Sequence, residues 1–147
     1  MATIRLPPDF KDFLRLLTSN NVEYMVIGGY AVNYYGFSRA TADLDIWIAI
    51  NPDNAERVVR AVREFGFTQS GPETFLEARK VVRMGVPPLR LEILTSISGV
   101  DFSDCYRRRL QVDLDGIAVN LIGLEDLKRN KEASGRLKDR LDLDQLG

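Results

Sequence analysis

The sequence predicts an α/β (α+β) protein, with a small mixed β-sheet and helices packed mainly on one of its faces. Short apolar runs alternate with amphipathic segments, and turn-forming steps separate them. The chain has 147 residues and is 45% hydrophobic, which is enough for one globular domain with its own core. We therefore expect a single domain over residues 1–147, with a core over about 1–123 and C-terminal helices over about 124–147.

The first half of the chain alternates between helix and strand. Residues 9–17 place apolar side chains three and four positions apart, which predicts a helix. The apolar run 24–27 predicts a buried strand, and 30–35 predicts a short helix. After a loop, residues 43–50 alternate acidic or aromatic with apolar side chains, which predicts a second strand with a core-facing side.

The second half follows the same logic. Asn51-Pro52-Asp53 is a typical helix start, and Gly66 a typical helix end. The pair Asp115-Gly116 between two apolar runs is a hairpin signal. The remaining expected elements are strands at 81–84, 89–94, 110–114 and 117–122, a short helix at 101–109, and helices from 124 onward with a break at Ser134-Gly135.

Composition excludes several classes of function. The formal net charge is −1, so the chain is not a generally basic nucleic-acid binder. No apolar run approaches the roughly 18 residues of a membrane span, and no signal-peptide core is visible. The single cysteine, Cys105, cannot form an internal disulfide, which favours a reducing cytoplasm.

The chain contains no histidine. This absence rules out histidine general bases, Ser-His-Asp triads and imidazole zinc sites. Any metal would have to be held mainly by oxygen, which favours Mg²⁺ or Mn²⁺.

Gly28 and Gly29 stand between the first strand and the second helix. Glycine allows a phosphate to approach the backbone closely, and the amides at a helix start point toward it. The same pair is also an ordinary way to turn a chain from strand to helix. The glycines alone therefore leave both a phosphate cradle and plain chain geometry open.

Asp43 and Asp45 lie one strand repeat apart, roughly 6–7 Å along the strand and on the same face. Aspartate is a poor strand former, and two like charges side by side repel. A divalent cation would remove this conflict, because hard ions prefer carboxylate oxygens. A solvated strand edge is the alternative, but the upstream glycine pair favours a metal site.

The pattern Gly28-Gly29, Arg39-x-Thr41-x-Asp43-x-Asp45 resembles the nucleotidyltransferase superfamily, which has a polymerase-beta-like fold. It is most similar to the bacterial branch that includes AbiEii-type toxins and small uncharacterised relatives. The resemblance covers nearly the whole chain. It implies a minimal nucleotidyltransferase fold, a nucleoside triphosphate substrate and a third carboxylate on a later strand.

Glu92 is our candidate for that third carboxylate, because strand parity places Arg90 and Glu92 opposite Leu89, Leu91 and Ile93. If this strand neighbours the second strand, Glu92 joins the two aspartates as a ligand of the two-metal type. The family pattern usually has aspartate here. Glu92 could equally be an ion-pair partner of Arg90.

The C-terminal segment by itself reads as a charged amphipathic helix pair. The resemblance adds that Lys131, near Ala133, faces the triphosphate and that Asp139, or else Asp142, assists the catalytic site. Arg39 and Thr41 join the glycines as candidate nucleotide-binding residues. Arg39 could contact the phosphates or pair with the aspartates.

We thus expect a cytoplasmic, Mg²⁺-dependent (or Mn²⁺-dependent) nucleotidyltransferase that moves a nucleoside monophosphate to an unknown acceptor and releases pyrophosphate. The resemblance allows an RNA or tRNA end, a protein or a small molecule as acceptor. Two alternatives stay open. One is a nucleotide-binding module with weak or lost turnover, and the other is a partner-binding component of a toxin–antitoxin pair that contacts an antitoxin.

Overall fold

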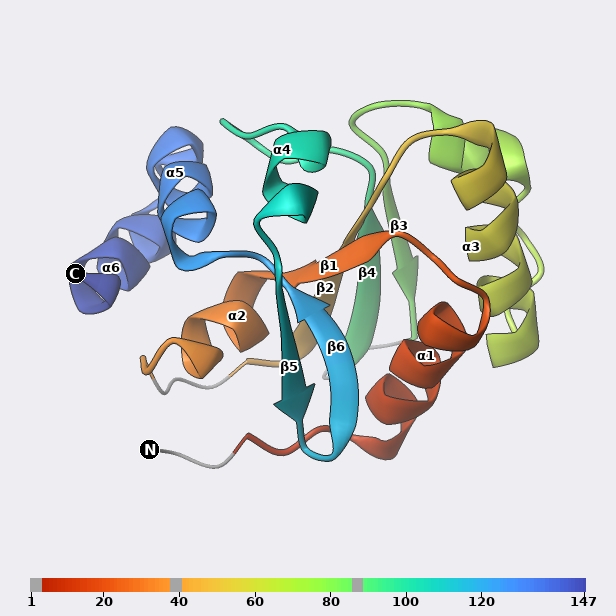
Figure 1. Ribbon diagram of the computed structural model, residues 1–147, viewed down its shortest axis with the longest axis horizontal. Coiled ribbons are helices and arrows are strands. Elements are labelled where there is room, and N and C mark those ends of the chain that lie inside the picture. Colours follow the sequence, from red (N-terminus) through yellow and green to blue (C-terminus); the bar gives the residue numbers. More distant parts are fainter. Residues whose placement is uncertain (1–3, 38–40, 86–88) are drawn as a thin grey trace.

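The computed structural model describes residues 4–37, 41–85 and 89–147. It contains a mixed sheet and six α-helices, as expected for the mixed α/β class (Figure 1). The elements in chain order are α1 (Pro8–Ser19), β1 (Tyr24–Ile27), α2 (Gly28–Tyr34), β2 (Asp43–Ile48), α3 (Pro52–Phe65), the 3₁₀ helix η1 (Pro72–Leu76), β3 (Val81–Met84), β4 (Arg90–Leu94), α4 (Phe102–Arg107), β5 (Leu110–Leu114), β6 (Ile117–Leu121), α5 (Leu124–Ser134) and α6 (Leu137–Leu146).

Six strands form the sheet in the order β3-β4-β2-β1-β6-β5. β1 and β2 lie at its centre and pair antiparallel. β1 also pairs in parallel with β6, and β2 pairs in parallel with β4. Hairpin partners β3 and β5 complete the two edges. The centre of the sheet therefore joins segments that are far apart in the sequence, and β2 is brought beside β4.

The two faces of β2 have different roles. Leu44, Ile46 and Ile48 lie on one face and are fully buried in the hydrophobic core. Trp47 lies on the other face with the aspartates, is 2% exposed, and packs edge-on against Phe102 of α4 at a centroid distance of 5.1 Å. β2 ends two residues before the predicted boundary, so Ile50 is exposed rather than part of the core.

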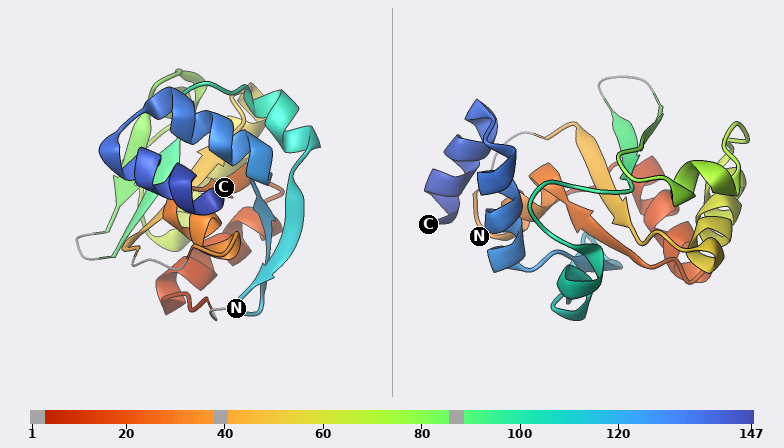
Figure 2. Two further views of the ribbon diagram at one scale, coloured as in Figure 1. Left: turned by 90° about the vertical axis from the view of Figure 1, so that its left-hand side faces the viewer. Right: turned by 90° about the horizontal axis from the view of Figure 1, so that it is seen from above.

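Two pairs of helices lie at opposite ends of the molecule. α1 and α3 pack together at one end, with Phe13 against Phe65, and α5 and α6 pack together at the other (Figure 2). None of the helices in the described ranges is both long and apolar enough to cross a membrane. The sheet therefore lies between a pair of amphipathic helices with buried apolar faces, α1 and α3, and the pair α5 and α6.

Local chemistry explains the helix boundaries. The side chain of Asn51 accepts a hydrogen bond from the amide of Asn54 at 2.8 Å, which caps α3, and Gly66 ends this helix in the left-handed region. Gly135 does the same for α5 at φ +65°. The predicted break before α6 is thereby confirmed, whereas η1, which buries Phe75, had no clear signal in the sequence.

Candidate functional site

Three carboxylates approach one another on one face of the sheet. Because β2 and β4 pair in parallel, Asp45 lies directly opposite Glu92 and Asp43 opposite Arg90. The three acids line a cavity of about 600 Å³ together with Gly28 and Gly29. The condition under which Glu92 would join the aspartates, that its strand neighbours β2, is therefore met.

Asp45 is the most perturbed of these groups. Burial, followed by the nearby negative charges of Glu92 and Asp43, raises the pKa of Asp45 from 3.8 to about 7. Its Oδ1 atom is buried and has no hydrogen-bond partner in the described residues. An ionised carboxylate in this position is stable only beside a positive charge, so the site is suited to a cation.

Two arginines neutralise the other two acids. Arg90 lies 3.2 Å from the Oδ2 of Asp43, and Arg83 lies 3.1 Å from the Oε1 of Glu92. Across the described parts of the chain, no three acidic or cysteine side chains are arranged as a ready-made metal cluster. Asp43 and Glu92 would therefore have to exchange their arginine partners for an ion.

The donor set nevertheless fits a hard divalent cation. All three candidate ligands are carboxylates, which Mg²⁺ and Mn²⁺ prefer. The orphaned Oδ1 of Asp45 supplies an oxygen that needs no rearrangement of a partner. The residues present therefore fit the expected metal, and Asp45 is the ligand whose Oδ1 is already free of other partners among the described residues.

Gly28 has a role that the sequence did not reveal. It adopts φ +69°, and a Cβ atom placed on it would lie 2.2 Å from the Oδ2 of Asp45. Glycine is therefore required here both by the backbone conformation and by the close approach of the carboxylate. Gly29 is buried in the first turn of α2 and also lines the cavity.

Lys131 is only 3% exposed, and its Nζ lies 3.1 Å from both Asp139 and Asp142. Asp139 also accepts hydrogen bonds from Ser134 and Arg136, each at 2.7 Å. Burial would raise the pKa of Asp139, but these donors together hold it below its ordinary value. Lys131 and the two acids thus form an internal ion network between α5 and α6, although Lys131 still borders the cavity.

The remaining sequence candidates are placed as follows. Thr41 lines the cavity, and its hydroxyl donates a hydrogen bond to the carbonyl of Asp43 at 3.3 Å. Arg39 lies outside the described residues. The sequence reading missed Arg83, Ser98, Asn130, Arg136 and Lys138, which also line the cavity. For Arg136 and Lys138 the only signal was the density of basic residues in the tail, which is equally typical of a solvated helix face, and Arg83, Ser98 and Asn130 had no signal.

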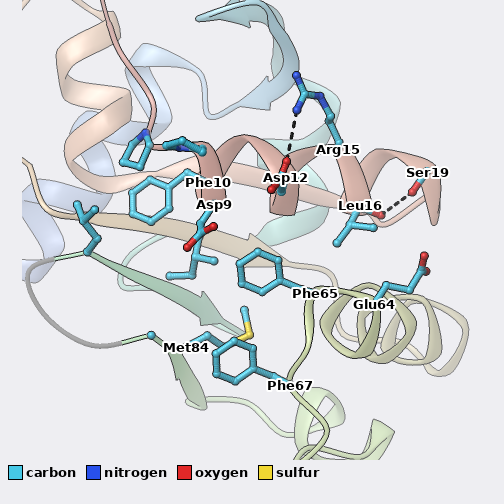
Figure 3. A pocket seen from close by; sticks show the side chains of 15 residues that line it. Asp9, Phe10, Asp12, Arg15, Leu16, Ser19, Glu64, Phe65, Phe67 and Met84 are labelled. Atoms are coloured by element: carbon cyan, nitrogen blue, oxygen red, sulfur yellow. Dashed lines mark hydrogen bonds and ion pairs between the residues drawn. The ribbon is translucent and has the colours of Figure 1, made fainter.

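A larger cavity, of about 900 Å³, lies elsewhere (Figure 3). Its lining includes Phe10 of α1, Phe65 at the end of α3, Phe67 just after this helix, and Met84 of β3. Met84 pairs with Leu91, the neighbour of Glu92, so Met84 and Leu91 point to the sheet face opposite the carboxylates. A molecule bound there would be separated from Asp45 by the sheet itself.

The chain thus has a strand-glycine-helix step beside paired aspartates in a mixed sheet, and solved structures of nucleotidyltransferases share its fold. A candidate nucleotidyltransferase from Thermotoga maritima superposes with a TM-score of 0.64 at 17% identity, covering 97% of this chain and 94% of its own. The lincosamide antibiotic adenylyltransferase LnuA, solved with lincomycin, gives 0.57 at 13% identity, covering 98% of both chains. An antigenic nucleotidyltransferase-like protein from Paracoccidioides brasiliensis gives 0.54 at 19% identity, covering 92% and 72%.

Residues 8–147 match the family described as nucleotidyl transferase of unknown function (DUF2204), and the chain belongs to this family. It is thus an enzyme of the nucleotidyltransferase class. No protein of curated function matches its sequence.

Proposed function

We propose that this protein transfers a nucleoside monophosphate from a nucleoside triphosphate to an acceptor and releases pyrophosphate, with Mg²⁺ (or Mn²⁺) bound by Asp43, Asp45 and Glu92. The observation that carries the proposal is the state of Asp45. Its carboxylate is packed against Gly28, faces Glu92 across the strand pair, and has one buried oxygen without a partner. A bound cation would satisfy this oxygen and allow the three acids to be ionised together.

The residues around the cavity have two roles, to bind the cation and to bind the phosphates. Asp43, Asp45 and Glu92 hold the cation, which when bound would neutralise phosphate charge and activate the attacking oxygen. The small Gly28 and Gly29 let the phosphates approach the backbone. The acceptor oxygen forms a bond to the α-phosphorus while the bond to the pyrophosphate leaving group breaks, and the proton of the acceptor passes to solvent. Catalysis then rests on positioning and electrostatics.

The acceptor class is the open part of this proposal. LnuA, which has the same fold over its whole length, is named as an adenylyltransferase of a small antibiotic molecule. This likeness supports a small-molecule acceptor. An RNA or tRNA end and a protein stay alternative acceptors. The net charge of −1 does not favour an extended nucleic-acid surface.

Label transfer from each α-³²P nucleoside triphosphate tests the proposal. The purified protein and its Asp45→Asn variant are incubated with Mg²⁺ and a bacterial lysate. We expect label only with the wild type, because the variant loses the metal ligand with little change in shape. Resistance to RNase and protease would identify a small-molecule acceptor. Equal labelling by both proteins would refute the metal assignment.

A nucleotide-binding module without turnover is the second candidate. The ion pairs of Arg90 with Asp43 and of Arg83 with Glu92 favour it, because a cation must displace both arginines. It predicts saturable Mg·NTP binding by calorimetry with no labelled product for any nucleotide.

Membership of the AbiEii-type branch, an antitoxin partner and a cytoplasmic location stay predictions.

A further inference from the structure

We infer that Lys138, rather than Lys131, is the side chain that binds the β- and γ-phosphates of the nucleotide in the candidate site. The inference rests on the proposed function, because it assigns a second wall of the same cavity. Asp43, Asp45 and Glu92 form the first wall, on the sheet. The second wall is defined by Asn130, Lys131, Ser134, Arg136 and Lys138 of the α5–α6 segment.

Lys131 cannot serve as a phosphate ligand without a large cost. Its ammonium group lies 3.1 Å from both Asp139 and Asp142, and these three side chains are almost fully buried. Movement of the ammonium group toward a phosphate would leave two buried carboxylates without their shared cation. Removing one partner from a buried ion pair is strongly destabilising, because it leaves an uncompensated buried charge. Lys131 therefore stabilises the second wall and does not offer its charge to a ligand.

Two further cations that line the cavity are also paired. Arg136 donates from its Nε to Asp139 at 2.7 Å, and Arg83 donates from its Nε to Glu92 at 3.1 Å. The charges of Lys131 and Arg136 together balance those of Asp139 and Asp142. The second wall is thus close to neutral before Lys138 is counted.

Lys138 differs from these three side chains. It lines the cavity, it is exposed, and it has no ion-pair partner among the described residues. Lys138 thus shares this cavity with Asp43, Asp45 and Glu92 of the first wall. A flexible, unpaired ammonium group facing a carboxylate-bound cation suits the charged oxygens of a polyphosphate.

Calorimetry with inorganic tripolyphosphate in the presence of Mg²⁺ tests this inference without requiring turnover. We expect Lys138→Gln to weaken binding about tenfold or more, as the loss of a charge-assisted hydrogen bond implies. Lys138→Arg should keep most of the affinity. Arg140→Gln is the matched control, because Arg140 is an exposed cation of the same helix that does not line the cavity, and it should bind as the wild type does.

Two results would overturn the inference. One is binding by Lys138→Gln within about twofold of the wild type. The other is a folded Lys131→Gln variant that loses more affinity than Lys138→Gln. Weaker binding by Lys138→Gln together with no label transfer by the wild type would uphold the inference and reject the proposed reaction. Label transfer with an unchanged KM for the nucleotide in Lys138→Gln would uphold the reaction and reject the inference.

Discussion

Gly28 and Asp45 show how a single position can serve both fold and site. The glycine lies where β1 passes into α2, and its missing side chain leaves room for the carboxylate from the neighbouring strand. The sequence made both residues candidates, but for different reasons: the glycine for a phosphate contact and the aspartate as a metal ligand. Their contact could not be predicted, because it depends on the antiparallel register that pairs Ile27 with Asp45.

Gly28→Ala tests this contact. We expect the variant to lose more than about 2 kcal/mol of folding free energy, from a left-handed backbone and a displaced Asp45. Gly135→Ala is the matched control, because Gly135 has φ +65° and its nearest neighbour for a Cβ atom is the carbonyl of Glu132 at 3.8 Å. It should lose only about 1 kcal/mol. Urea unfolding of both variants measures the difference, and equal losses would contradict the steric role of Gly28.

At the scale of elements, short-range chemistry was predictable and long-range pairing was not. The Asn51 cap, the Asp115-Gly116 hairpin and the break at Gly135 each depend on a few adjacent residues, and the structure confirms them. The role of Lys131 depends on which acids α6 brings to it. The tail offers several acids at similar spacing, so its pattern could not distinguish a phosphate ligand from an internal ion pair.

Asp139→Asn tests whether this aspartate fastens α6 to α5. We expect the variant to lose about 3 kcal/mol of stability at pH 7, because Lys131 and Arg136 lose a charged partner. Since the pKa of Asp139 is lowered in the folded protein, its stabilisation is present above the unfolded value near 4 and is lost as the pH falls below it. The gap between variant and wild type should therefore shrink in acid.

Urea unfolding at pH 7 and at pH 3 measures this gap. The control is Asp144→Asn, which removes an exposed acid from the same helix and should change stability by less than about 0.5 kcal/mol. A pH-independent loss in Asp139→Asn would argue against an electrostatic role.

At the scale of the whole molecule, the candidate site is the meeting place of two different walls. The first wall, which holds the carboxylates, is built from β2 and β4 of the sheet, and the second wall from α5 and α6. Asn130 donates to the carbonyl of Ser98 at 3.0 Å, and Gly99 packs so closely on α5 that a Cβ atom there would lie 2.4 Å from the Cβ of Ala133. The loop after β4 therefore sets the separation of the two walls.

Gly99→Ala should push α5 away from this loop. We expect it to weaken Mg·tripolyphosphate binding about tenfold, with a far-ultraviolet circular dichroism spectrum like that of the wild type. Gly116→Ala is its control, because Gly116 has a similar φ of +85° but nothing within 4 Å of a Cβ atom. It should leave the binding unchanged. Wild-type affinity in Gly99→Ala would show that the wall spacing does not limit binding.

The helix α6 buries few apolar side chains, and this bears on when pyrophosphate leaves the site during a turnover. Leu137 and Leu141 are 74% and 55% exposed, and α6 packs mainly on α5 through the Lys131 ion network. Elements with few buried apolar contacts open locally at lower free energy than the rest of a fold. An opening that separates α6 from α5 would have to break the Lys131 ion network, but it would leave β2 and β4 paired. Such an opening would move Lys138 away from the cavity before the first wall changes. Pyrophosphate would then leave while Asp43, Asp45 and Glu92 keep their positions.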